Sequence, residues 1–361
     1  EPRSLTMDRS RLPFSRRAAL LLSFFSLSAC GSNQELPDSV KKRNGTVVVE
    51  SCALDPWQTA TLQSDSARAV LNEVILLCLY VRNGVAEPLA PADQSSVAQV
   101  TSSLKQRGYR VRLGVTTGET PGTTPSALEG ILVDPAKRAA LIASLAGFAP
   151  ISDGIALAPP TLLPTSEASF RAFVNELAAT LPDRRVGLFA PPSSMTPSDV
   201  ASGDAIKLSA LSSSLSRSYL MTLDLHCCDD VPGPTTASDW ITRVVTFARS
   251  QTNTASLSFS LPLYGTYFGA TKTQRQVSYA EAAGMAASRH IEILRREDTG
   301  SLYFSFSDAG GVSTVVFDDS HSLLRTLSEV DAGVPADVGV LYYGLGGEDP
   351  NLFAALKERM K

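Results

Sequence analysis

The feature that most constrains the fold is a regular alternation of short apolar runs with amphipathic segments after residue 45. Runs such as GTVVVESC (45–52) and LNEVILLCLYV (71–81) are rich in β-branched and large apolar residues, and they predict buried strands. Segments such as 94–108 and 166–182 place apolar residues at helical spacing and predict helices that cover the strands. The alternation recurs about eight times and predicts an α/β fold, a (β/α)8 TIM barrel, with a doubly wound open sheet as the alternative.

Residues 1–29 have the pattern of an export signal. Arginines up to Arg17 precede the apolar run AALLLSFFSLSAC (18–30), which is shorter than a membrane-spanning helix requires. The run ends in Leu27-Ser28-Ala29-Cys30, which resembles the bacterial lipobox, in which the cysteine is lipidated. We therefore expect residues 1–29 to be a signal peptide and Cys30 to carry a lipid. The predicted location is the cell envelope, on the outer membrane if the host has two membranes.

The rest of the chain predicts a short polar tether at 30–45 and a single domain at 46–361, with a small hairpin insertion before the last strand. The formal net charge of −4 gives no support to a nucleic-acid-binding function. Cys52 and Cys78 fall on neighbouring predicted strands, where a disulfide is one alternative and free thiols the other. The adjacent Cys227 and Cys228 are expected to be free and buried.

Chemistry in a TIM barrel is carried by the loops that follow the carboxyl ends of the strands. Glu50, Asp224 and His226 fall there, and a new acid–base pair of Glu50 and Asp224 is one alternative. Residues 226–230 include metal-ligand types but lack the spacing of zinc motifs. The sequence thus predicts no metal site and no cofactor, and it contains no G-x-S-x-G motif of a serine hydrolase.

Several segments together resemble glycoside hydrolase family 18, the chitinase-type barrels, and above all its spore-germination peptidoglycan hydrolases. The resemblance runs from about residue 46 to the C-terminus. The segments that carry it are VTSSLKQRGYRVRLGVTTGE (100–119), PAKRAALIASLAGFAPISDGIAL (135–157), SEASFRAFVNELAATLP (166–182), MTLDLH (221–226), LSFSLPLYG (257–265) and the closing block 315–356. Each is short, but their order matches the family over nearly the whole predicted domain.

The resemblance implies a substrate-assisted hydrolysis in which a glutamate at the end of the fourth strand protonates the glycosidic oxygen. An aspartate two residues earlier orients the acetamido group of the substrate. In this chain the first aspartate of the motif is Asp153, the two further aspartates are replaced by Ala156 and Ala158, and the acid is replaced by Pro160. The side chains of alanine and proline cannot donate a proton or orient an amide.

The sixth-strand tyrosine of the family is also replaced, by Leu223, although the aspartate after it is retained as Asp224. Tyr343 stands where the family has a tryptophan beneath the sugar. The sequence therefore predicts an inactive barrel that binds N-acetylglucosamine-containing glycan, such as peptidoglycan or a chitin-like oligosaccharide. Two alternatives remain: a structural or protein-partner-binding barrel, and an active hydrolase with displaced carboxylates. The predicted glycan-binding residues are Glu50, Trp57, Asp224, Tyr264 and Tyr343.

Overall fold

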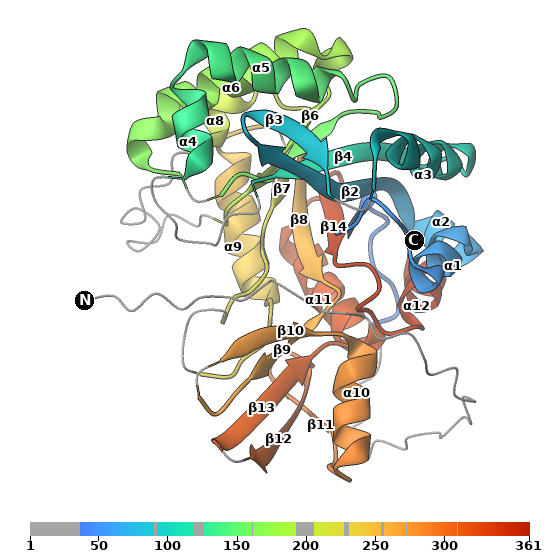
Figure 1. The fold of residues 1–361 in the computed structure, drawn as a ribbon. Coiled ribbons are helices and arrows are strands. Elements are labelled where there is room, and N and C mark those ends of the chain that lie inside the picture. Colours follow the sequence, from blue (N-terminus) through green and yellow to red (C-terminus); the bar gives the residue numbers. More distant parts are fainter. Residues whose placement is uncertain are drawn as a thin grey trace.

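A computed structural model of the chain shows a closed barrel of eight parallel strands surrounded by helices, with a second, smaller sheet attached (Figure 1). The alternation of apolar runs and amphipathic segments is thus realised as the predicted TIM barrel. None of the described helices is long and apolar enough to cross a membrane. The structure describes residues 37–361 except 90–91, 118–125, 161, 193–205, 227–230, 254–255, 272 and 309.

The barrel closes because its first strand pairs in parallel with both the second and the last. Its strands, in spatial order, are β1 (Gly45–Val49), β14 (Gly339–Tyr343), β8 (Leu257–Pro262), β7 (Arg217–Leu220), β6 (Val186–Ala190), β5 (Ile155–Leu157), β4 (Arg110–Thr116) and β2 (Leu71–Arg82). An additional strand, β3 (Val85–Pro88), forms a hairpin with the end of β2. Strands β5 and β7 are shorter than their apolar runs, because the chain leaves the sheet at Ala158 and Met221.

The helices are α1 (Pro56–Gln63), α2 (Asp65–Val70), α3 (Gln94–Gln106), α4 (Ala127–Leu132), α5 (Pro135–Ala146), α6 (Glu167–Thr180), α8 (Leu208–Leu211), α9 (Ser238–Arg249), α10 (Tyr279–Ser288), α11 (Ser320–Gly333) and α12 (Leu352–Arg359). The longer helices lie where amphipathic segments predicted them, whereas the short helices α1, α2, α4 and α8 were not predicted. The α1 and α11 helices begin at capping boxes, in which Asp55 and Asp319 accept hydrogen bonds from backbone amides of the first turn.

The insertion before the last barrel strand is larger than the predicted hairpin. The hairpin itself, β12 (Leu302–Asp308) and β13 (Gly311–Phe317), is present, but it belongs to a five-stranded antiparallel sheet. The remaining strands, β9 (Gly265–Phe268), β10 (Gln274–Val277) and β11 (Leu294–Arg295), are short, and their weak patterns escaped the sequence analysis. Helix α10 packs on this sheet around Phe304 and Phe317, and the whole unit lies beyond one end of the barrel (orange in Figure 1).

The described end of the predicted tether is packed rather than free. Val40 is buried and bridges to Met360, and Arg43 is buried against Asp331 with an Nη2–Oδ1 distance of 2.5 Å. These contacts place residues 37–44 at the base of the barrel, where the strands begin. The segment that leads away from the domain therefore starts at the base, and the folded unit begins earlier than residue 46.

The barrel interior is polar at the base and apolar above it. Glu73 and Arg112 form a buried ion pair of 2.5 Å, and the Tyr219 hydroxyl donates to Glu73 at 3.1 Å. Burial acts to raise the pKa of Glu73, but the positive charges of Arg112, Arg110 and Arg217 hold it below its ordinary value. The base is therefore filled by a hydrogen-bonded network.

Candidate functional site

The candidate site lies at the mouth of the barrel, where the strands end. Parallel strands bring their carboxyl ends to one face, and in TIM barrels this face carries the chemistry. Strands β1, β5, β7, β8 and β14 deliver the predicted residues to this face. Four of the five predicted glycan-binding residues form two hydrogen-bonded pairs here, and the fifth, Trp57, bonds to a residue that the sequence analysis missed.

The register of β5 shows which side chains of the motif strand point inward. Ala156 is fully buried and packs with the interior cluster, together with Ala158, whereas Ile155 and Leu157 pack outward against the helices. Strand β5 ends at Leu157, and Pro160 lies in the loop that follows it at the rim. The described interior face of β5 therefore presents no titratable side chain to the mouth.

The retained aspartate of the motif lies at the opposite end of the strand. Asp153 precedes β5, and its carboxylate accepts a hydrogen bond of 2.8 Å from the backbone amide of Val111 and pairs with Lys105 at 3.3 Å. Gly154 follows in a conformation with φ of +150°, and a Cβ there would meet the Arg185 carbonyl oxygen at 2.3 Å. The Asp-Gly pair is thus a structural feature of the base, at the end of the strand opposite to the mouth.

Aromatic rings fill the centre of the mouth. The Phe189 ring lies 5.3 Å from that of Tyr219 and 6.4 Å from that of Tyr343, and Tyr343 lies 6.4 Å from Tyr264. Leu223, in the position of the family tyrosine, packs in the same cluster. The Tyr343 side chain is only 8% exposed, so the predicted aromatic platform is largely covered by its neighbours.

Two carboxylates at the rim accept hydrogen bonds from these tyrosines. The Tyr343 hydroxyl donates to Glu50 Oε1 at 2.7 Å, and the Tyr264 hydroxyl donates to Asp224 Oδ1 at 2.8 Å. Burial, and next the charge of Asp224, raise the pKa of Tyr264 well above its ordinary value, so its hydroxyl remains a donor. Asp224 adopts φ of +59°, a left-handed conformation that aspartate tolerates better than most residues.

Trp57 lies on the first turn of α1, and its side chain is 45% exposed. Its indole N–H donates to Glu348 Oε1 at 3.0 Å, and the amide of Gly346 donates to Glu348 Oε2 at 2.6 Å. Burial raises the pKa of Glu348, while these hydrogen bonds lower it. Glu348 was not predicted from the sequence, although it lies five residues after the predicted platform Tyr343.

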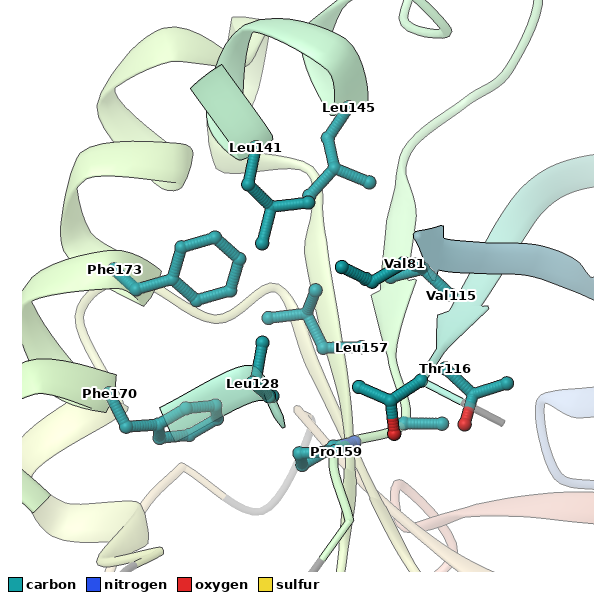
Figure 2. A pocket seen from close by; sticks show the side chains of 12 residues that line it. Val81, Val115, Thr116, Leu128, Leu141, Leu145, Leu157, Pro159, Phe170 and Phe173 are labelled. Atoms are coloured by element: carbon teal, nitrogen blue, oxygen red, sulfur yellow. The ribbon is translucent and has the colours of Figure 1, made fainter. Parts of the chain in front are cut away.

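An apolar pocket lies outside the barrel, between β4, β5 and the helices α4, α5 and α6 (Figure 2). Leu157, Leu141, Phe170 and Phe173 point into it from these elements. Its volume of about 20 Å³ is room for about one water molecule, far too little for a sugar ring. We therefore place the candidate site at the mouth and not in this pocket.

The structure forms the disulfide that the sequence left open, between Cys52 and Cys78 with Cα atoms 5.1 Å apart. Cys30, Cys227 and Cys228 lie outside the described residues, as does most of the segment 226–230 considered for metal binding. Within the described part of the chain, no group of three or more His, Cys, Asp or Glu side chains is placed to hold a metal ion.

No protein-family model and no curated protein sequence matches the chain. Solved structures share its fold: the spore cortex-lytic enzyme SleL of Bacillus cereus matches with a TM-score of 0.74 at 16% identity, over 90% of this chain and 76% of that one. A chitinase of Chromobacterium violaceum gives 0.71 at 19% identity, over 88% and 98% of the two chains. A family 18 N-acetylglucosaminidase of Paenibacillus barengoltzii gives 0.64 at 15%, over 88% and 100%. The predicted chitinase-type barrel fold is confirmed.

Proposed function

We propose that this protein is a non-catalytic barrel of the cell envelope that binds N-acetylglucosamine-containing glycan, first of all peptidoglycan, at the mouth of the barrel. The observation that carries the loss of catalysis is the register of β5. Ala156 and Ala158 pack in the interior cluster, and Pro160 stands at the position aligned with the acid, so the segment that would supply the proton donor has none. Leu223 likewise offers no hydroxyl to hold an acetamido carbonyl.

The residues around the rim support glycan binding. A sugar ring presents an apolar face and many hydroxyls, so it is bound by aromatic surfaces beside hydrogen-bond acceptors. Trp57 and Glu50 are exposed at the carboxyl end of β1, and Asp224 is partly exposed after β7. The solved neighbours named above include enzymes whose names describe action on chitin and on spore cortex, which favours glycan as the ligand class.

The envelope location rests on the signal pattern and is supported by where the chain leaves the domain. Residues 37–44 pack at the base, and six residues, 31–36, separate them from Cys30. An extended chain of this length reaches at most about 25 Å. A lipid on Cys30 therefore holds the base near the membrane and turns the mouth toward the cell wall. The disulfide agrees with an oxidising compartment outside the cytosol.

A second candidate is a barrel that binds a protein partner or serves a structural role. It is favoured by the low exposure of Phe189, Leu223, Tyr264 and Tyr343, which leaves the described floor of the mouth closed. In that case the exposed Trp57 is part of a protein interface. The two candidates differ in whether saturable glycan binding is measured.

Calorimetry of the full chain with a β-1,4-linked N-acetylglucosamine hexamer and with muropeptides, beside a reducing-sugar release assay, separates the candidates. We expect binding without turnover, and at least tenfold weaker binding for Trp57→Ala. Trp240→Phe, a change on helix α9, is the matched control and leaves the affinity unchanged. If neither glycan binding nor sugar release is detected, the second candidate is supported. Turnover that is abolished by Asp224→Asn establishes the third, an active hydrolase with displaced carboxylates.

A further inference from the structure

The Cys52–Cys78 disulfide joins a rim loop to the wall of the barrel. Cys52 lies in the loop between β1 and α1, and both cysteines are buried, at 3% and 0% exposure. Cys78 is the extra residue of a β-bulge in β2, because Leu77 pairs with Gly114 and Leu79 with the next residue, Val115. Bulges re-aim side chains and occur preferentially beside functional sites. Here the bulged residue is Cys78 itself, the partner of Cys52 in the disulfide.

The cross-linked loop carries two of the predicted glycan-binding residues. Glu50 lies two residues before Cys52, and Trp57 lies five residues after it. Both are bonded to the end of β14 and the loop that follows it: Tyr343 donates to Glu50, and Trp57 donates to Glu348. We call these two facing segments, residues 50–58 and 343–348, the rim clasp.

Two further hydrogen bonds hold the rim clasp, one from a side chain to backbone and one from the clasp to the backbone of β1. Gln58 Nε2 donates to the Leu345 carbonyl oxygen at 2.8 Å, and the Leu345 amide donates to the Val48 carbonyl oxygen at 3.0 Å. Glu50, Ala53, Asp55, Pro56 and Trp57 are all exposed, so few apolar contacts fix this loop. Its position therefore depends on its covalent link to β2, on Leu54, which packs against the main core, and on its hydrogen bonds to residues 343–348.

We propose that the Cys52–Cys78 disulfide is a positioning element of the glycan site, which fixes the rim clasp so that Trp57 presents a rigid aromatic surface. This inference rests on the proposed glycan function for the identity of the ligand. A platform that is ordered before binding loses less conformational entropy when the sugar binds. The side chain of Glu348 fixes one edge of the indole, and the disulfide fixes the backbone from which the indole extends.

The two tryptophans of the chain make the proposal measurable, because each can be left as the only one. In a Trp240→Phe background, fluorescence reports Trp57 alone, and in a Trp57→Phe background it reports Trp240 alone. The test variant is Cys52→Ala with Cys78→Val, which replaces the buried sulfurs with apolar atoms. The pair Cys52→Ser with Cys78→Ser is the second variant, should the first fail to fold. Acrylamide quenching and steady-state anisotropy are measured on the full chain.

We expect the disulfide-free protein to show a roughly twofold higher quenching constant and a lower anisotropy for Trp57, with Trp240 unchanged. We also expect at least tenfold weaker binding of the N-acetylglucosamine hexamer. Unchanged Trp57 quenching, even with a lower melting temperature, overturns the proposal and leaves the disulfide a purely structural link. An equal change at Trp240 also overturns it, because the whole domain has then loosened.

A wild-type protein that binds no hexamer contradicts the proposed function and, with it, the ligand assigned to the rim clasp. The quenching comparison still decides whether the disulfide positions Trp57, so the two failures are distinguishable. Glu348→Gln and Glu348→Leu complete the test with the disulfide intact. The glutamine retains an acceptor for the indole and is expected to keep Trp57 quenching within a few per cent of the wild type, whereas the leucine raises it.

Discussion

The hydroxyl of Tyr264, at the end of the β8 strand run, donates a hydrogen bond of 2.8 Å to the Asp224 carboxylate, which follows β7. The pair joins two neighbouring strands at the mouth of the barrel, and the tyrosine ring is buried while the aspartate is partly exposed. Asp224 is the residue that the sequence resemblance aligns with an aspartate of the family 18 motif. In this structure its carboxylate orients a buried tyrosine.

We expect Tyr264→Phe to lower the free energy of unfolding by about 1–3 kcal/mol, because it removes a hydrogen bond to a charged acceptor. Asp224→Asn keeps an acceptor oxygen in place and is expected to cost less than about 1 kcal/mol. Urea denaturation of the two variants checks the prediction. A larger loss for Asp224→Asn than for Tyr264→Phe contradicts it.

Restoring the family aspartate at position 156 is expected to destabilise the barrel. Ala156 pairs with Gly114 and Gly187 on the neighbouring strands, and the Tyr219 ring lies against Gly187. A carboxylate placed in this packed interior lacks a partner, so we expect Ala156→Asp to cost at least about 3 kcal/mol. Ala158→Asp, closer to solvent, is the control and costs less than about 1 kcal/mol.

The fourfold variant Ala156→Asp, Ala158→Asp, Pro160→Glu and Leu223→Tyr tests whether the rest of the site is intact. We expect no release of reducing sugar from chitin oligomers, because the aromatic packing of the mouth leaves these side chains no open floor. Measurable turnover by this variant shows instead that the mouth opens enough to admit substrate.

The ion pair at the base of the barrel is expected to behave as a unit. Glu73→Leu leaves Arg112 buried without its carboxylate partner, and we expect a loss of about 3–5 kcal/mol in the free energy of unfolding. The double variant Glu73→Leu with Arg112→Leu removes both charges and is expected to recover part of that loss. Chemical denaturation of the two single variants and the double variant measures the coupling. Additive losses contradict the prediction.

Asp318 is expected to make stability depend on pH between about 4 and 6. Burial, and to a lesser extent the neighbouring charge of Asp319, raise the pKa of Asp318 to about 6, although the hydroxyls of Ser301 and Ser322 oppose the shift. An unfolded aspartate titrates near 3.9, so between these values the folded protein binds more protons. The contribution of Asp318 is therefore greatest below pH 4 and falls by up to about 3 kcal/mol as pH rises to 6.

Asp318→Asn removes this titration, so the variant gains stability relative to the wild type as pH rises from 4 to 7. Thermal or urea unfolding at pH 4, 5, 6 and 7 checks the slope. Asp319→Asn is the contrasting variant, because hydrogen bonds from Arg295 and Ser322 outweigh burial and lower the pKa of Asp319. The loss of stability caused by Asp319→Asn is expected to be larger at pH 7 than at low pH. Parallel slopes for the two variants contradict the assignment.

The sequence by itself determined the barrel. Eight apolar runs separated by amphipathic helices leave few other ways to bury both faces of parallel strands. From the resemblance to family 18, the sequence also predicts that Ala156, Ala158 and Pro160 stand where an enzyme of that family carries its carboxylates. The size of the insertion was not readable, since β9, β10 and β11 are too short to show a period.

Only the tertiary structure decided how the mouth is arranged. That Tyr343 meets Glu50, that Trp57 meets Glu348 and that Cys52 bonds Cys78 depends on which loops the closed barrel brings together. Sequence spacing also does not reveal that Tyr343 is buried while Trp57 is exposed. Exposure depends on neighbours that are distant in the sequence, as Glu348 is from Trp57, almost three hundred residues away. Local periodicity specifies strands and helices, whereas the contacts that build a site are made between them.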